Sequence, residues 1–314
     1  MKFALILLLT LSSHFSIAQL FPGEGDNIDY LITSGKKAPI SVGDDDHQQV
    51  VFFLLPTEYS SSFYIRVYDP ETGGAIDEKV DSLDTETSFI VYGGKGNYSD
   101  SISRSVSYQK NSSGISLKKR TFGSTTNYQK KWFTFGPFNP KRGEFVESLN
   151  GYVFKLVIEG ISGDDVNLYK LALSSSDKAN INVAGANIFT YEYSFRLKSA
   201  SSSICHLYPY MDQKIVSIRQ YNFDTDNDAV LRLYSIKKKG EIASVSGNGN
   251  WGSSEHKIDQ EEKGKCLDLQ LKKKASWHND VVMYVLNQYN EAVPFFASPI
   301  GGAVNPKFTF KSDK

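Results

Sequence analysis

The segment Asn150–Leu197 restricts the fold of this chain more than any other part of the sequence. It contains three runs in which apolar and polar side chains alternate, Tyr152–Ile158, Val166–Leu173 and Phe189–Leu197. Alternation with a period of two is what a β-strand with one buried and one solvated face requires. The Gly- and Asp-rich residues 160–165 between the first two runs are typical of a β-hairpin turn. The segment therefore predicts an antiparallel, all-β fold.

The same pattern recurs on both sides of this segment. On the N-terminal side it predicts strands at Gln49–Leu55, Ser62–Asp69, Glu86–Tyr92 and Lys131–Phe138. On the C-terminal side it predicts strands at Ile204–Tyr210, Lys214–Tyr221, Ala229–Ser235, Glu241–Val245, Lys265–Leu271, Val281–Asn287 and Val293–Phe296. No stretch after residue 18 keeps the i, i+3, i+4, i+7 apolar spacing of an amphipathic helix for three turns, so we expect little helix.

Length and internal similarity predict two tandem antiparallel β-sandwich domains of related type. Two pairs of segments resemble each other: Ile65–Tyr68 with Leu231–Tyr234, and Val153–Ile158 with Cys266–Leu271. The spacing between the two pairs differs, because a polar insertion near residues 93–131 has no counterpart in the second half. That insertion forms either peripheral strands or a mobile loop. We place the domains at residues 19–177 and 178–314.

The first 18 residues have the features of a secretory signal peptide. Lys2 supplies a positive charge, Phe3–Leu11 is apolar, and Ser16–Ala18 is a small-x-small cleavage site before Gln19. No Cys follows the apolar run, which excludes a lipoprotein anchor, and no later stretch is long and apolar enough to predict a membrane-spanning helix. The mature protein is therefore expected to be exported, to the periplasm or to the outside of the cell.

Cys205 and Cys266 are the two cysteines of the chain. In an oxidising compartment an even pair suggests one disulfide, and the alternative is two buried free thiols.

The charge balance excludes nucleic acid and anionic membranes as partners. Lys and Arg number 35, and so do Asp and Glu, so the chain has no basic excess with which to bind nucleic acid or an anionic membrane surface.

Motifs of catalytic chemistry are missing from the sequence. Four histidines follow the leader, and none forms an HxH or HExxH motif; CxxC and GxSxG motifs are also absent. We therefore predict a protein that is not an enzyme and that uses no cofactor. A hydrolase with an unrecognised site stays open as an alternative.

One segment resembles the beginning of a calcium-binding loop. Asp224, Asp226 and Asp228 place carboxylates at alternate positions, as such loops do. The sixth position is Ala229 where the loop needs Gly, and the closing Glu is missing, so an acidic hairpin turn is favoured. The adjacent carboxylates of residues 44–46 and 164–165 are interpreted as solvated turns, because neighbouring residues on a strand point apart.

Two tryptophans are candidates for a contact surface. Trp251 and Trp277 both lie in polar segments beside turn residues, and both are interpreted as loop residues. An exposed Trp in a loop suggests contact with a protein or a glycan, and the alternative is packing of the loop on its own sheet.

Several features together resemble a known family. The signal ends at Ser16–Ala18 before Gln19, and the Tyr- and Phe-rich chain includes GDDVNLYKLALS at Gly163–Ser174 and FTYEYSFRL at Phe189–Leu197. In these features the chain looks like exported proteins of bacteria with gliding motility and type IX secretion. By overall size and domain plan, the mature chain resembles the plug subunit at the periplasmic mouth of the type IX secretion translocon. The resemblance implies a periplasmic protein that closes an outer-membrane barrel. It rests on no diagnostic motif and assigns no residue a role.

Three hypotheses on function follow. The first is a structural or interaction protein whose partner is an integral outer-membrane barrel or another exported protein. The second is a glycan-binding or adhesion module that uses Trp251 and Trp277. The third is the hydrolase with an unrecognised site.

Overall fold

The computed structural model describes residues 19–82, 84–106, 111–198, 203–274 and 278–301. The leader predicted at residues 1–18 and the candidate contact residue Trp277 lie outside these ranges. Within them the chain consists of antiparallel β-strands joined by loops, and its longest helical segment is a 3-10 turn of four residues. The all-β prediction is confirmed.

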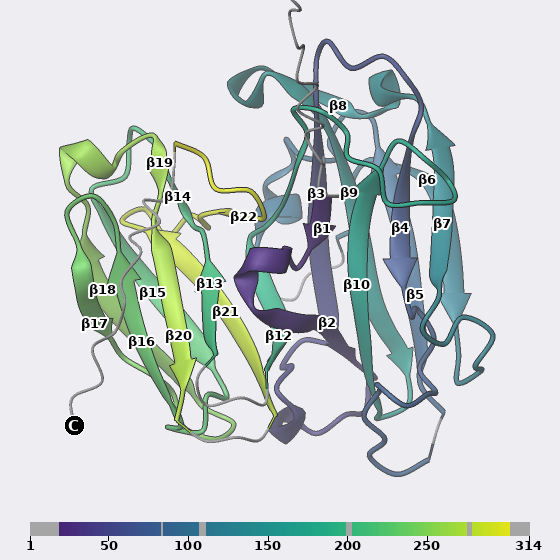
Figure 1. Ribbon diagram of the computed structural model, residues 1–314, viewed down its shortest axis with the longest axis horizontal. Helices are drawn as coiled ribbons and strands as arrows, with labels where there is room; N and C mark the ends of the chain where they lie inside the picture. Colours follow the sequence, from purple (N-terminus) through teal and green to yellow (C-terminus); the bar gives the residue numbers. More distant parts are fainter. Residues whose placement is uncertain (1–18, 83, 107–110, 199–202, 275–277, 302–314) are drawn as a thin grey trace, which may run out of the picture.

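The strands form four antiparallel sheets (Figure 1). The longest sheet contains, in order, β18 (Trp251–Lys257), β15 (Ser217–Phe223), β21 (Asn279–Asn287), β12 (Glu192–Leu197), β2 (Ile28–Ser34), β10 (Val166–Ser174), β4 (Phe63–Tyr68) and β7 (Trp132–Phe138), with β1 (Gln19–Phe21) beside β10. The second contains β22 (Phe295–Phe296), β11 (Asn187–Thr190), β3 (Gln48–Pro56), β9 (Gly151–Ser162), β5 (Glu86–Gly93) and β6 (Ile115–Phe122), with β8 (Glu144–Val146) beside β9.

Two smaller sheets complete the fold. One contains β13 (Ile204–Leu207), β20 (Asp268–Lys273), β16 (Ala229–Tyr234) and β17 (Lys239–Ala243), and the other pairs β14 (Tyr210–Met211) with β19 (Lys265–Cys266). Short 3-10 turns lie at η1 (Glu24–Asp26), η2 (Ile40–Val42), η3 (Ser101–Arg104), η4 (Pro140–Arg142), η5 (Glu147–Leu149) and η6 (Gln260–Glu262).

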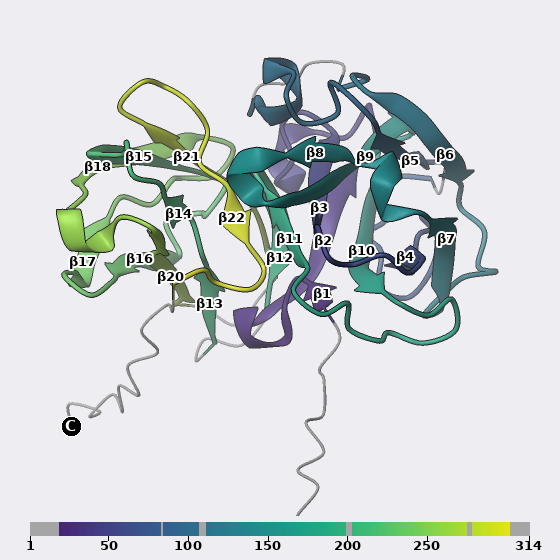
Figure 2. The same cartoon turned by 90° about the horizontal axis from the view of Figure 1, so that it is seen from above.

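The sheets stack into two lobes, each with two layers (Figure 2). In the N-terminal lobe the β2–β10–β4–β7 part of the long sheet faces the second sheet, and the rings of Phe63 on β4 and Phe154 on β9 lie 4.8 Å apart across the interior. In the C-terminal lobe the β18–β15–β21–β12 part of the long sheet faces the β13–β20–β16–β17 sheet. Antiparallel layers packed through their apolar faces are the arrangement of a β-sandwich.

Strand pairing continues from one lobe into the other. β12 pairs with β21 on one side and with β2 on the other, and Phe195 of β12 lies opposite Leu31 of β2. The largest apolar core cluster likewise contains buried side chains from both lobes. Backbone hydrogen bonds and a shared core therefore join the two lobes.

The segments that resemble each other in sequence are strands in both lobes, but they pair differently. β4 and β9 lie in different sheets and face each other, whereas β16 and β20 are hydrogen-bonded neighbours. The similarity of sequence therefore does not extend to the order of the strands.

The predicted hairpin between the first two alternating runs is wrong. β9 pairs with β3, β5 and β8, whereas β10 pairs with β1, β2 and β4, so the connection at residues 163–165 crosses between sheets. Gly163 has a φ of +70°, and a Cβ there would lie 2.2 Å from Oγ1 of Thr85, so only Gly fits the crossing.

The third alternating run is not one strand but two. β11 belongs to the second sheet and β12 to the long sheet, and the chain changes sheet at Tyr191. Gln49 holds this change in place: its Nε2 donates to the carbonyl of Glu192 at 2.8 Å, and the backbone nitrogen of Ser194 donates to its Oε1 at 2.9 Å.

The polar insertion supplies one edge strand. The insertion contains two short runs that could pair as peripheral strands, Ser103–Tyr108 and Gly114–Lys119. The second of these corresponds to β6, which pairs with β5 at the edge of the second sheet. The first run begins inside the turn η3 and is not a strand in its described residues, whereas residues 107 and 108 lie outside the described ranges. The Lys155 ammonium, which is buried, donates to the hydroxyls of Ser103 and Ser113 and so ties the insertion to β9.

The predicted disulfide between Cys205 and Cys266 does not form. Both are free, buried thiols. Cys205 lies on β13 opposite Leu271, whereas Cys266 lies on β19 opposite Tyr210, and the two side chains pack in different apolar clusters. The thiol of Cys266 accepts a hydrogen bond from the backbone nitrogen of Ile300 at 3.2 Å.

No helix among the described residues is long and apolar enough to cross a membrane.

Candidate functional site

Trp251 lies at the start of strand β18 and not in a loop, and its side chain belongs to a row of aromatic rings. Its ring centroid is 5.0 Å from that of Tyr284 on β21, and Tyr284 stacks on Tyr221 of β15 at 4.6 Å. Trp251 is 38 % exposed, and both tyrosines are half-buried. The three rings therefore form a partly open platform across three neighbouring strands.

Two carboxylates border this platform. The loop between β2 and β3 brings Asp45 to Trp251, whose indole Nε1 donates to Asp45 Oδ2 at 3.1 Å. Glu192 of β12 is the cross-strand partner of Tyr284 on β21, so the two side chains share a face of the sheet. We call Tyr221, Tyr284, Trp251, Asp45 and Glu192 the aromatic–acidic surface.

The carboxylates at this surface are crowded by like charges. Burial raises the pKa of Glu192 well above its usual range, and the neighbouring Asp46, Asp45 and Asp44 raise it further. Burial also raises the pKa of Asp45, although the hydrogen bond from Trp251 lowers it. Among the described residues no ion pair involves any of these four carboxylates. A cation or a group rich in hydrogen-bond donors would relieve the repulsion.

A small hollow, with room for about one water molecule, lies beside this surface and shares Glu192 with it. We call it the acidic hollow; it is lined by Asp46, Gln48, Val50, Phe52, Ser103, Ser105, Asn111, Tyr191 and Glu192. Its polar lining groups are carboxylates, amides and hydroxyls. Asn111 is 4 % exposed, and its Oδ1 has no hydrogen-bond partner.

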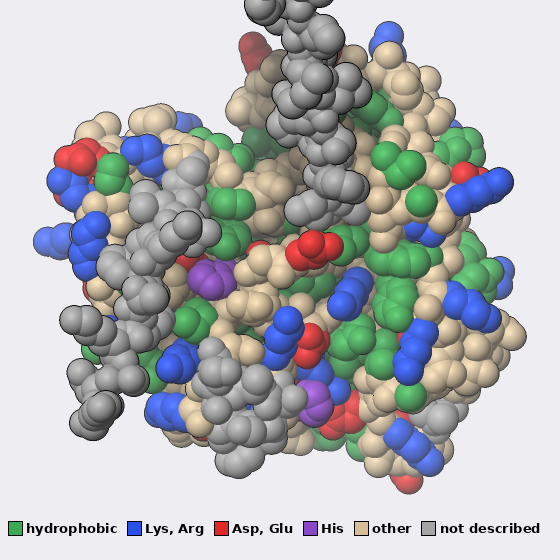
Figure 3. All heavy atoms as spheres, in the orientation of Figure 1, with side chains coloured by type: hydrophobic (Ala, Val, Ile, Leu, Met, Phe, Trp, Pro, Cys, Tyr) green, Lys and Arg blue, Asp and Glu red, His purple; other side chains and the backbone are tan. Residues whose placement is uncertain are grey.

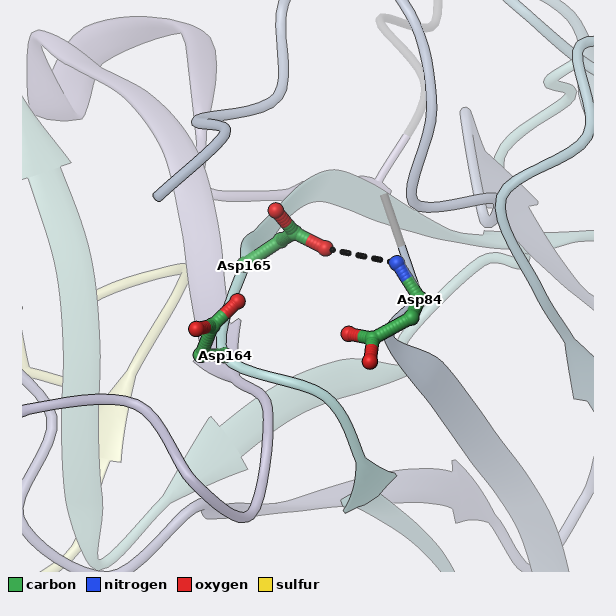
Figure 4. A group of neighbouring side chains, drawn as sticks. All are labelled: Asp84, Asp164 and Asp165. Atoms are coloured by element: carbon green, nitrogen blue, oxygen red, sulfur yellow. Dashed lines mark hydrogen bonds between the residues drawn. The ribbon is translucent and has the colours of Figure 1, made fainter. Parts of the chain in front are cut away.

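A separate group of carboxylates could also hold a metal ion. Ligand oxygens of Asp84, Asp164 and Asp165 lie within 4.8 Å of one another, the one such group of His, Cys, Asp and Glu among the described residues. Figure 4 shows the Asp84 carboxylate pointing toward Asp164, while Asp165 turns to the backbone nitrogen of Asp84. The interpretation of residues 164–165 as a solvated turn misses this convergence. Asp165 is fully buried, and its oxygens already accept bonds from the backbone nitrogens of Val80, Asp84 and Thr85.

The calcium-loop candidates Asp224, Asp226 and Asp228 do not converge into such a group. Asp224 accepts a hydrogen bond from the backbone nitrogen of Gly249 at 2.6 Å, and burial raises its pKa to about 6. Asp226 and Asn227 both have a φ of +55°. The segment is a tight turn between β15 and β16, and the structure does not bring the three carboxylates together.

Three side chains near β18 lie in the order of a catalytic triad. Ser254 Oγ is 2.9 Å from His256 Nε2, and His256 Nδ1 is 2.6 Å from Glu241 Oε1. Ser254 Oγ also accepts hydrogen bonds from Gln220 Nε2 and from the backbone nitrogen of Ser244. Because these two donors occupy the lone pairs that a nucleophile would use, the arrangement serves to link β15, β17 and β18.

The remaining histidines are engaged elsewhere or exposed. His47 Nδ1 is 2.9 Å from Ser34 Oγ, and His278 is exposed. His206 Nδ1 lies 3.0 Å from Asp268; burial lowers the pKa of His206, but the bond and charge of Asp268 outweigh it and the net shift is upward. No two of these histidines share a ligand set among the described residues.

The environment of Asp26 predicts that the protein loses stability as the pH rises. Asp26 is 3 % exposed, and burial raises its pKa from 3.8 to about 7, although the bond from the backbone nitrogen of Gly23 and the charge of His206 lower it and Asp268 raises it. A raised folded-state pKa gives stability that is full below about pH 4 and is lost as the pH rises through about 7. His206, with its raised pKa, acts in the same direction.

We therefore expect the free energy of unfolding to fall between pH 5 and pH 8, with an Asp26 contribution of the order of 3 kcal/mol. Urea unfolding of Asp26→Asn at a series of pH values checks this, because Asn keeps an acceptor for Gly23 but does not titrate. An unchanged pH slope in Asp26→Asn would show that the pKa of this carboxyl is not raised.

Acidic and basic side chains are interspersed with apolar ones on the face shown in Figure 3, without a continuous patch of one sign. This agrees with the formal net charge of +0.

Comparison with known proteins does not identify a relative. No family model matches the chain, and no curated protein matches it. Solved structures of infectious bursal disease virus, of the Gx and Gt strains, align with 86% of this chain and with 74% and 75% of theirs, at 10% and 11% identity. Their TM-scores are 0.14 and 0.13, and they support no conclusion on fold or function.

Sequence reasoning identified only part of the site. The sequence singled out Trp251. The other members of the aromatic–acidic surface, two tyrosines and two carboxylates, come from strands and loops that no local motif connects. Asp45 and Trp251 are 206 residues apart in the chain. The sequence contained one usable signal, the unusual density of acidic residues at 44–46.

Proposed function

We propose that this protein is a non-enzymatic, exported interaction protein that binds a protein partner through its aromatic–acidic surface. The observation behind this proposal is the partly open platform of Tyr221, Tyr284 and Trp251 bordered by Asp45 and Glu192. Tyr and Trp supply large contact areas at low cost in conformational entropy, and they are the residues that dominate protein interfaces. Clustered carboxylates favour a partner segment that presents Lys or Arg.

The resemblance to the type IX plug subunit suggests one such partner, an outer-membrane secretion barrel closed at its periplasmic end. The continuous sheet is suited to this role, because a plug must resist deformation and the lobes are joined by backbone hydrogen bonds. Periplasmic localisation and the barrel both belong to the proposal.

Affinity purification of a tagged copy from its own cells tests the proposal. We expect an outer-membrane barrel to co-purify from membranes in mild detergent with the wild-type protein, and at least tenfold less with the Trp251→Ala, Tyr284→Ala double variant. Ile242→Ala is the matched control, because Ile242 is an exposed apolar residue, 68 % accessible, on the remote strand β17. Equal recovery of partner with the double variant and the control would contradict the role of the surface.

A glycan ligand is the second candidate, and the exposed indole of Trp251 beside Asp45 favours it. Sugar rings stack on aromatic faces, and carboxylates accept hydrogen bonds from sugar hydroxyls. Retention on a polysaccharide panel that is lost in Trp251→Ala would establish this candidate in place of the protein partner.

A further inference from the structure

The acidic hollow has the donor set of a hard metal ion. Two carboxylates, Asp46 and Glu192, face a space that is otherwise lined by amide and hydroxyl groups and by the apolar side chains of Val50 and Phe52. One oxygen of Asp46 accepts a hydrogen bond from the backbone nitrogen of Gln48 at 2.9 Å. Among the described residues no hydrogen bond reaches the carboxylate of Glu192. Both lining carboxylates therefore have oxygens that accept no hydrogen bond among the described residues.

Asn111 supplies an independent observation. Asn111 is buried, with 4 % of its surface exposed, and it lines the same hollow. Its Nδ2 donates a hydrogen bond to Gln48 Oε1 at 2.8 Å. That bond fixes the orientation of the amide, and its Oδ1 is left as a buried acceptor without a partner. A buried carbonyl oxygen without a partner is unfavourable unless a donor or a cation satisfies it.

We propose that the acidic hollow binds one calcium ion, with the carboxylates of Asp46 and Glu192 and the amide oxygen of Asn111 as its protein ligands. Calcium takes six to eight oxygen ligands in flexible geometry, and carboxylates can bind it through both oxygens. The hollow has room for about one water-sized sphere, which is the space that a single ion needs. Zinc and copper prefer His and Cys, which do not line the hollow. Magnesium needs regular octahedral geometry and gives up its water reluctantly.

Among the described residues, no cationic side chain forms an ion pair with Asp46 or Glu192. Lys155 donates to the hydroxyl of Ser103, and Arg104, which lies between the lining residues Ser103 and Ser105, hydrogen-bonds to Tyr191. The group at Asp84, Asp164 and Asp165 is the competing site. There the oxygens of Asp165 already accept three backbone hydrogen bonds, which leaves less capacity for a metal.

Calorimetric titration of the complete mature protein, stripped with chelator and desalted, tests the site with CaCl₂ and, in parallel, MgCl₂. We expect one calcium per chain with a Kd of about 10⁻⁴–10⁻³ M, typical of extracellular modules. Glu192→Gln and Asn111→Ala should each weaken binding at least tenfold. Asp164→Asn is the matched control and should bind as the wild type does. Because the isolated protein is titrated, the result is independent of the proposed partner.

Thermal unfolding adds a readout that a purely structural role would not give. Without calcium, Glu192→Gln should melt at a higher temperature than the wild type, because it removes a repelling charge. In 10 mM CaCl₂ the wild type should melt at the higher temperature, because calcium binding stabilises the wild type and not Glu192→Gln. Absence of binding up to 10 mM, or loss of binding in Asp164→Asn but not in Glu192→Gln, would overturn the proposal.

Discussion

Replacing Arg196 by Met should lower the free energy of unfolding by about 3–5 kcal/mol, because it leaves the carboxylate of Asp280 buried without its partner. The two side chains are cross-strand neighbours on β12 and β21, joined by two hydrogen bonds of 2.7 and 2.6 Å. Arg196 is 7 % exposed and Asp280 8 %. Glu78 of the N-terminal lobe also accepts from Arg196, so this guanidinium links the lobes.

Lys198→Met is the control for this prediction. Lys198 pairs with Asp29 at 3.8 Å, and both side chains are about one-third exposed, so its removal should cost less than about 1 kcal/mol. Urea unfolding of both variants measures the difference. If Arg196→Met lost no more stability than Lys198→Met, the bonds of Arg196 to Asp280 and Glu78 would not stabilise the contact between the lobes.

Replacing Asp165 by Ala should cost about 3 kcal/mol or more, because three buried backbone nitrogens lose their acceptor. Its carboxylate accepts from Val80 at 3.2 Å, from Asp84 at 3.2 Å and from Thr85 at 3.3 Å. These bonds hold the segment before β5 against the crossing between β9 and β10. The loss should therefore appear both as reduced stability and as faster hydrogen exchange of these three amides.

Asp164→Ala provides the matched comparison. Asp164 is the adjacent residue of the same carboxylate group, but no hydrogen bond reaches its Oδ1. Its replacement removes a like charge beside Asp165 and should leave stability unchanged or slightly raised. Equal destabilisation by the two variants would show that the turn, and not the acceptor role of Asp165, determines the effect.

The parts of the fold that the sequence predicts are the strands with a strong apolar signal. β3, β9, β10 and β21 are recognisable because one face or both are apolar and fully buried. β18 was missed because it is an edge strand with only one buried side chain, that of His256. Edge strands need no apolar face, so their alternation is weak.

How the strands pair could not be predicted from local pattern. The run Phe189–Leu197 alternates without a break, yet the chain changes sheet at Tyr191 because Gln49, some 140 residues earlier, binds the backbone there. The same limit applies to the cysteines. An even count in an exported chain suggests a bond, but Cys205 and Cys266 lie on strands of different sheets.

The candidate sites show this limit most clearly. Asp164 and Asp165 meet Asp84 only because the β9–β10 connection crosses between sheets. Trp251 was identified from its polar surroundings, whereas the aromatic platform depends on the register of β15 with β21, which places Tyr221 opposite Tyr284. The sequence therefore indicated Trp251 alone, and the fold determines which side chains lie around it.

Site-specific photo-cross-linking in living cells tests the proposed binding surface most directly. A photoreactive residue in place of Ser253, an exposed position on β18 opposite Tyr221, should give one discrete cross-linked partner. The same residue in place of Ile242, exposed on β17, should give none. A partner captured from position 242 and not from position 253 would contradict the account, since the binding face would then lie on the other sheet of the C-terminal lobe.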